Sequence, residues 1–231
     1  KTDVAYLARV NREAVVKEKY NLINIFNKKN ISIFNKSIFV SDNINYVKNL
    51  YYLYADSLNY YYIDDLWLIS NKEIKGNDSF KKKRIPKYYE INFDENKLID
   101  FKAQDTEITG FGWDNVGIDG GKNMDGYFST ILFKANGKNC KNNSLIRFKL
   151  EKYYKNLLLP LEVTLVFNKN QNENIILDKN NEFKFYFNCK VNEINTIDII
   201  VNDPKSLFDL KKGLNKNKRS IVLKSIAINS Q

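Results

Sequence analysis

The sequence predicts an α+β protein in which a small α/β segment precedes an antiparallel, jelly-roll-like β-sandwich. In the first third, apolar residues recur at helical spacing beside short strand patterns. From about Glu90 onward, apolar and polar residues alternate in runs separated by turns rich in Asn, Lys and Gly. Short strands at such intervals are typical of sandwiches and jelly rolls. We therefore divide the chain into residues 1–89, which end in a basic linker, and residues 90–231.

The α/β segment is expected to begin with a helix. Apolar residues at helical spacing predict this helix over residues 3–20, and residues 31–34 and 37–40 are strand candidates. Ser41-Asp42 is expected to cap a second helix that ends near Ala55.

An aromatic run, residues 60–70, is expected to form a strand that leads into a turn. The polar stretch that follows, residues 71–89, holds Pro86 and the basic run 81–84, so it is expected to be a linker or loop.

The β-sandwich is predicted from six runs in which apolar residues alternate with polar ones. These runs are residues 128–134, 145–151, 161–167, 183–187, 197–201 and 220–228. Cys189 continues the alternation of the fourth run, so it is expected to lie on the same face as Phe183, Phe185 and Phe187. A buried free thiol is therefore its expected state, with a disulfide to Cys140 as the alternative.

The composition excludes several classes of function. The chain of 231 residues has no histidine, which excludes a Ser-His-Asp or Cys-His triad and a histidine-ligated metal within it. Its net charge of +10 is spread evenly, and abundant Lys and Asn are expected from codon bias, so nucleic acid is not an expected partner. The longest apolar run, residues 157–161, is too short to span a membrane.

A glycine-rich tract, residues 110–130, is the strongest candidate for a ligand-binding rim. It holds six of the nine glycines and one of the two tryptophans, Trp113. Aromatic faces such as Trp113 and Tyr127 can stack on a sugar ring, while carboxylates such as Asp114 and Asp125 bind its hydroxyls. The alternative role of Trp113 is to plug the end of the sandwich core.

The same tract offers oxygen ligands for calcium at Asp119 and Asp125. Turn formation accounts for clustered Asp, Asn and Gly without a metal, so no cofactor is expected. In the first part of the chain, Asp56, Asp64 and Asp65 are the alternative catalytic carboxylates. Neighbouring residues on a strand point to opposite faces, which favours a turn role for the last two.

A basic sheet face is a further alternative. Four cations lie on the polar faces of predicted strands: Arg147, Lys149, Lys184 and Lys190. If adjacent strands bring them together, they would attract phosphate or carboxylate groups on a polymer.

The last 120 or so residues of the chain resemble the C-terminal β-sandwich domain of bacterial phosphoglycerol-transferase-like and glycosyltransferase-like envelope proteins. The resemblance rests on Gly112-Trp113, on the strand-like run 126–131 and on a loop, residues 203–210, that precedes Arg219. It implies glycan or glycolipid handling, with Arg219 as a ligand-binding residue. The chain departs from the family pattern at Asn217, where an acidic residue is frequent, and at Ile221, where a glycine is frequent.

The first 70 residues resemble, more weakly, the tail of an SGNH-type hydrolase or acyltransferase. The similar motifs are residues 53–56 and residues 62–70, in which Trp67 stands at the position of the family's catalytic histidine. The resemblance therefore implies a copy without triad chemistry.

Together these observations predict an accessory, carbohydrate-binding module of a bacterial surface-polysaccharide or glycolipid protein, associated with the cell envelope. Because the chain begins at Lys1 rather than Met, it is expected to be processed or to be a fragment. A catalytic domain of the same longer protein is then among the expected partners. The alternatives are a glycan-modifying transferase or hydrolase and a structural protein-interaction domain.

Overall fold

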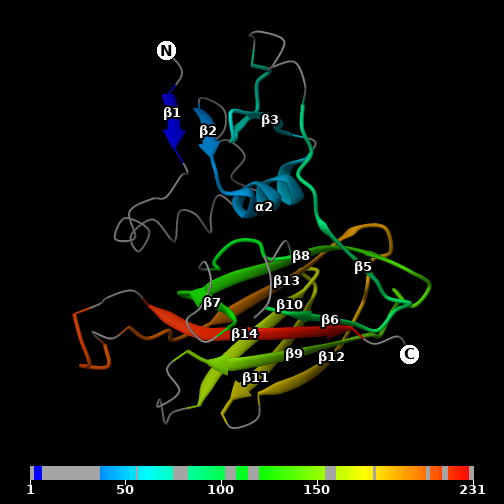
Figure 1. Ribbon diagram of the computed structural model, residues 1–231, viewed down its shortest axis with the longest axis vertical. Coiled ribbons are helices and arrows are strands. Elements are labelled where there is room, and N and C mark those ends of the chain that lie inside the picture. The colour runs from blue at the N-terminus through cyan, green and yellow to red at the C-terminus, as the bar shows by residue number, and fades with distance from the viewer. Residues whose placement is uncertain are drawn as a thin grey trace. The chain divides into compact units, whose positions relative to one another are not determined.

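The structure is a computed structural model, and it describes the chain in ten stretches. These are residues 3–6, 37–55, 57–74, 83–101, 108–113, 120–153, 160–178, 181–206, 209–214 and 218–228. The chain divides into two compact units, Lys1–Lys87 and Tyr88–Gln231 (Figure 1).

The N-terminal unit is a four-stranded sheet with one helix. The sheet has the strand order β1 (Asp3–Tyr6), β2 (Ser37–Ser41), β4 (Leu66–Ser70) and β3 (Asn59–Ile63). The helix is α2 (Ile44–Tyr54), whose buried face includes Val47 and Leu50. These two residues pack with Phe39, Trp67 and Ile69 in a small core, so Trp67 is a core residue of this unit.

The predicted N-terminal helix is wrong at its start. Residues 3–6 form β1, which pairs in parallel with β2, with Asp3 opposite Ser37 and Tyr6 opposite Val40. Backbone pairing with a strand more than thirty residues away has overridden the local helical spacing. The rest of that predicted helix and the strand candidate 31–34 lie outside the described residues.

Two further details of this unit differ from expectation. The cap of α2 is Asn43, whose side-chain oxygen accepts a hydrogen bond of 2.9 Å from Asn45 N. The aromatic run forms two antiparallel strands, β3 and β4, rather than one strand. Asp64 and Asp65 make the tight turn between them with φ angles of 47° and 62°. Asx residues tolerate such angles, which the two-residue turn of a hairpin requires.

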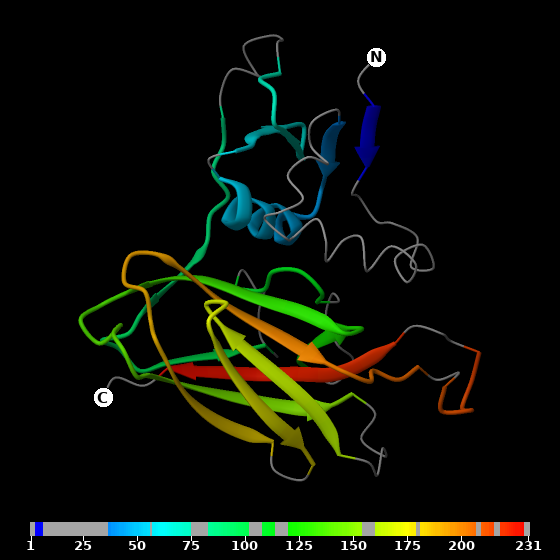
Figure 2. The same cartoon turned by 180° about the vertical axis from the view of Figure 1, so that it is seen from behind.

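The C-terminal unit is a sandwich of two five-stranded sheets, so the predicted fold class is confirmed (Figures 1 and 2). The first sheet has the strand order β11 (Gln171–Leu177), β10 (Leu161–Phe167), β13 (Ile194–Val201), β8 (Phe128–Asn136) and β5 (Tyr89–Asn92). The second sheet has the order β12 (Glu182–Phe187), β9 (Ser144–Lys152), β14 (Arg219–Ile228) and β6 (Lys97–Asp100), and β7 (Lys122–Asp125) also pairs with β14. The strand pairs are antiparallel, except that β5 is parallel to β8.

The alternating pattern produces the core between the two sheets. Phe185 and Phe187 on β12 are buried, whereas Lys184 and Tyr186 between them are exposed. All six predicted strands occur, extended by one to three residues at some ends. Four strands lacked a clear pattern: the short β5, β6 and β7, and β11, which is rich in Asn and Gln.

The predicted free thiol is wrong. Cys140 and Cys189 form a disulfide, with their Cα atoms 5.1 Å apart. Cys189 lies on the buried face that the alternation predicted, and Cys140 comes from the connection between β8 and β9. The disulfide therefore joins two connections at the same end of the sandwich, an end that we call the disulfide end (residues 137–143, 168–170 and 188–193).

Candidate ligand-binding site

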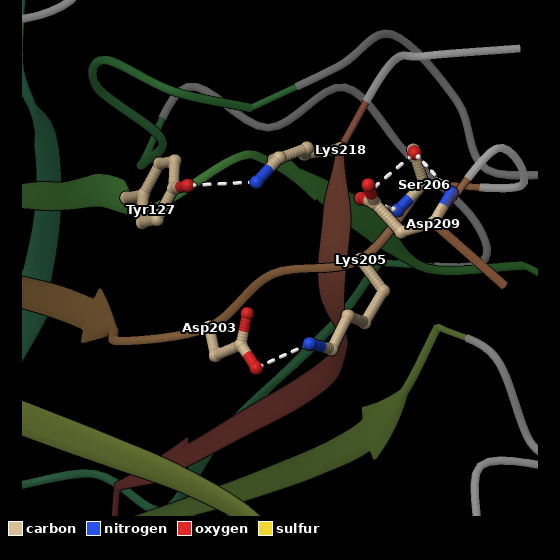
Figure 3. Close-up of polar contacts among 6 residues, drawn as sticks. All are labelled: Tyr127, Asp203, Lys205, Ser206, Asp209 and Lys218. Atoms are coloured by element: carbon tan, nitrogen blue, oxygen red, sulfur yellow. Dashed lines mark hydrogen bonds and ion pairs between the residues drawn. The ribbon is translucent and has the colours of Figure 1, made fainter.

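The candidate site lies at the opposite end of the sandwich. There β8 and β14 begin and β13 ends, and the connections bring together six polar residues (Figure 3). We call this the Tyr127 end (residues 110–113, 120–127, 202–206, 209–214 and 218–219). It contains the described parts of the glycine-rich tract, so the strongest candidate rim of the sequence lies here.

Glycine is required where the tract packs against β8. A Cβ on Gly112, whose φ is 83°, would lie 2.1 Å from the carbonyl oxygen of Phe128. No side chain fits at that distance, and the positive φ also favours glycine. The backbone of residues 110–113 can therefore lie directly beside β8, where Gly110 N donates to Thr130 O and Phe111 N to Thr130 Oγ1.

Trp113 is held within the domain by both parts of its side chain. Its indole Nε1 donates a hydrogen bond of 2.7 Å to Thr130 O. Its half-buried ring packs against the sandwich core, and its backbone bridges to Met124. These contacts agree with the alternative in which Trp113 closes the end of the sandwich core, because a buried indole N–H usually has a hydrogen-bond acceptor.

Tyr127 is the exposed aromatic side chain of this end. The side chain is 37% exposed. Val201 N donates to Tyr127 O at 2.8 Å, and the backbone N–H of the preceding residue, Gly126, donates to Lys218 O at 3.1 Å. The backbone that carries the ring is therefore held by hydrogen bonds to neighbouring segments.

Lys218 lies against the hydroxyl of Tyr127. Its Nζ donates a hydrogen bond of 2.9 Å to the phenolic oxygen and is 5.3 Å from the ring centroid (Figure 3). The first distance is far shorter than the second, so the ammonium lies toward the oxygen edge of the ring and not above its centre. The hydrogen bond with Tyr127 is the main cause that raises the pKa of Lys218, so the ammonium stays charged at neutral pH.

The acidic residues of this end have partners. Asp203 forms an ion pair with Lys205. Asp209 Oδ2 accepts from Ser206 N at 2.9 Å and from Ser206 Oγ at 2.8 Å, while Asp209 N donates back to Ser206 Oγ. This reciprocal arrangement is a capping box. The hydrogen bonds from Ser206 are the main cause that lowers the pKa of Asp209.

Arg219 lies behind the exposed residues. Its side chain is buried, and its backbone exchanges two hydrogen bonds with Lys205, of 3.0 and 2.7 Å. In the register of β7 with β14 it stands opposite Asp125. The fold therefore brings four of the predicted ligand-binding residues to one end: Trp113, Asp125, Tyr127 and Arg219.

Other predicted site residues are not described or lie elsewhere. Asp56, Asp114 and Asp119 lie outside the described residues, and only the backbone of Asp125 is described, so the calcium site stays a prediction. Asp64 and Asp65 belong to the N-terminal unit, where Tyr62 OH donates to Asp65 Oδ1 at 3.0 Å. This hydrogen bond is the main cause that raises the pKa of Tyr62. Within the described stretches, no three acidic or cysteine side chains gather as metal ligands would.

The strands bring part of the predicted basic face together. Lys184 on β12 stands directly opposite Arg147 on β9, and Lys149 is opposite Glu182, with which it forms an ion pair of 4.0 Å. Lys190 lies beyond the end of β12. A negative partner at Lys149 leaves a smaller basic face than expected.

The sequence patterns do not mark Lys218, Asp203, Lys205 or the capping box as site residues. The spacing Ser206-x-x-Asp209 is a readable capping signal, but nothing local places Lys218 beside Tyr127, which is 91 positions away. Among the described residues, no helix is long and apolar enough to cross a membrane.

No protein-family model matches the chain, and no curated protein matches it in sequence. Solved structures similar to it include a family two carbohydrate esterase from Cellvibrio japonicus, with 10% identity and a TM-score of 0.36 over 59% of this chain and 34% of that one. The CBM36-1 domain of a multidomain xylanase from the hindgut metagenome of Trinervitermes trinervoides has 10% identity and a TM-score of 0.39 over 59% of this chain and 98% of that domain.

A third similar structure is the mosquito-larvicidal Cry4Aa toxin from Bacillus thuringiensis, with 10% identity and a TM-score of 0.38 over 72% of this chain and 26% of that one. The chain thus spans about a third of the length of the esterase and about a quarter of the toxin. The resemblance to phosphoglycerol-transferase-like envelope proteins stays a prediction.

Proposed function

We propose that the C-terminal unit is a carbohydrate-binding module whose ligand stacks on Tyr127. The observation that carries this proposal is an exposed aromatic ring, 37% accessible, on a paired backbone at the rim of a β-sandwich. The less polar face of a pyranose ring packs on such an aromatic plane. Because the backbone on both sides of Tyr127 is already ordered, binding costs little conformational entropy.

Polar groups around the ring supply the second part of a sugar site. The ammonium of Lys218 and the ion pair of Asp203 with Lys205 lie at the same end of the sandwich (Figure 3). Sugar hydroxyls both donate and accept hydrogen bonds, so a mixed set of cations and carboxylates can bind them. A few placed polar groups beside an apolar surface are what fix the orientation of a small ligand.

Trp113 and Arg219 support this site from behind rather than from the exposed side. Trp113 donates its indole N–H to Thr130 O, and Arg219 is only 8% exposed. We assign both residues to holding the backbone that carries Tyr127 and Lys218. Asp114 and Asp125 stay candidate ligands of the sugar hydroxyls.

The biological context we propose is the bacterial cell envelope, as an accessory module for surface polysaccharide or glycolipid. The sequence resemblance supports this context, and so does the disulfide, because disulfides persist in oxidising compartments. In this proposal the chemistry belongs to another domain.

The test is binding of the purified chain to an array of neutral and acidic glycans. We expect Tyr127→Ala to abolish binding, since it removes the stacking plane. The matched control is Tyr186→Ala, because Tyr186 is also an exposed tyrosine, 53% accessible, but lies on β12 away from the site. Equal loss in both variants, or a wild-type chain that binds no glycan, would overturn the proposal.

A further inference from the structure

We infer that the site selects glycans that carry a negatively charged substituent, and that Lys218 binds this charge. The inference rests on the proposed function and adds the chemical class of the ligand. The substituent is a carboxylate or a phosphate, which offer an ammonium the same chemistry, an anionic oxygen.

Among the acidic residues of this end whose side chains are described, Asp203 and Asp209 already have closer partners, and they attract Lys218 less strongly than its hydrogen bond with Tyr127 does. Asp203 is paired with Lys205, and Asp209 is occupied by the hydrogen bonds of its capping box. Within the described part of the chain, the close polar contact of Lys218 Nζ is a neutral phenol. The ammonium is therefore a cation whose nearest partner carries no charge.

The ammonium also has hydrogen-bonding capacity to spare. An ammonium carries three N–H donors, and the bond to Tyr127 uses one of them. The side chain is partly buried against the ring, so its position is defined by the phenol before a ligand arrives. An anionic oxygen would form charge-assisted hydrogen bonds with the remaining donors.

The position of the ammonium suits a ligand that stacks on Tyr127. It lies 2.9 Å from the phenolic oxygen and 5.3 Å from the ring centroid, toward the edge of the ring. A sugar can therefore occupy the aromatic face while a substituent at its periphery reaches past the hydroxyl to Lys218. A cation centred over the face would compete with the sugar for the same surface.

Nearby charges favour an anion over a cation as the substituent. Exposed Lys211 and Lys212 follow Asp209 in the same connection, and Arg219 adjoins Lys218. In the described residues of this end from position 203 onward, cations outnumber carboxylates. The summed field therefore attracts a negatively charged ligand.

The test compares Lys218→Gln with wild type on paired acidic and neutral glycans. The array includes oligogalacturonate and its methyl ester for the carboxylate, and a glycerol-phosphate oligomer for the phosphate. We expect wild type to prefer acidic members, and Lys218→Gln to weaken their binding about tenfold, the loss expected for a hydrogen bond to a charged group. Affinity for acidic glycans should also fall between 50 and 500 mM salt, on the order of the screening expected for an exposed pair.

Lys141→Gln is the matched control, because it removes an exposed lysine at the disulfide end, away from both candidate binding surfaces, and should leave binding unchanged. The inference is overturned if neutral and acidic glycans bind equally or if Lys218→Gln binds acidic glycans as wild type does. In both cases the proposed function survives, provided that Tyr127→Ala still abolishes binding. If no glycan binds, or if a single-stranded DNA oligonucleotide binds more tightly than every glycan, the proposed function fails as well.

Discussion

The two ends of the β-sandwich differ in how completely their polar groups are used. At the disulfide end, Asn195 is fully buried and satisfied, since its Oδ1 accepts from Lys190 N and from Asn168 Nδ2. Its Nδ2 donates to Lys190 O and to Glu193 O. At the Tyr127 end, an aromatic ring is exposed, and Lys218 keeps donors for a further partner.

This difference indicates that one end stabilises the fold and that the other exposes groups for a ligand. A covalent bond and a satisfied amide pair hold three connections together at the disulfide end. The other end can then expose groups that contribute little to the fold, because a scaffold that is rigid elsewhere keeps them in place. The stability that each end supplies can be measured with variants at the two ends.

The largest effect is expected from loss of the disulfide. Cys140→Ser with Cys189→Ser removes a crosslink between residues 49 positions apart. We expect the free energy of unfolding to fall by about 2 to 5 kcal/mol, the usual range for a native crosslink. Chemical denaturation with and without reductant measures this, and reduced wild type should match the double variant. A wild-type chain that reacts with a thiol reagent before reduction would contradict the disulfide.

Removal of the buried amide comes next. Asn195→Ala leaves Lys190 N and Asn168 Nδ2 without the oxygen that they share. We expect a loss of about 3 kcal/mol in the free energy of unfolding, because two buried donors lose a partner. Urea denaturation measures this loss. A variant as stable as wild type would show that water replaces the amide and that this end is open to solvent.

Asp198 lies on β13 between the two ends of the sandwich, opposite Thr130 on β8. A substitution there measures the cost of a buried carboxyl group. Burial raises its pKa from 3.8 to about 6, against the opposing effect of Lys169. Because the pKa of Asp198 is raised in the folded state, its protonated carboxyl contributes fully to the stability of the fold below pH 3.8. This contribution is lost as the pH rises through about 6.

Asp198→Asn should therefore stabilise the protein at pH 7 and lose that advantage toward pH 4. The gain is at most about 3 kcal/mol, the free energy that corresponds to a rise in pKa from 3.8 to about 6. Thermal or urea unfolding of both proteins across this pH range measures it. A difference that is the same at pH 4 and pH 7 would exclude a shifted carboxyl as its cause.

The smallest effects are expected at the Tyr127 end. Tyr127→Ala and Lys218→Gln should each change the free energy of unfolding by about 0.5 kcal/mol or less, since both side chains lie at the surface. Denaturation curves that overlay that of wild type would also validate both variants for the binding experiments. Losses as large as that of Asn195→Ala would remove the contrast between the ends.

Local sequence patterns specify the strands of the sandwich and the neighbourhood of the site. Alternation along residues 161–167 and 183–187 reports which face of each strand is buried, and this property is local because side chains of a strand alternate with period two. The concentration of glycine around Trp113 likewise marked the place where backbone packs closely against β8. These signals are readable because they depend on residues close together in the chain.

Contacts between distant residues set the other features of the fold and the site. Residues 3–6 form a strand because they pair with β2, Cys140 forms a disulfide with Cys189, and Lys218 lies beside Tyr127. Each of these contacts links residues far apart in the chain, and the last one depends on how β8, β13 and β14 align at their ends. Register between distant strands is set by the packing of the whole core, so the partner of Tyr127 could be found only after the sandwich was assembled.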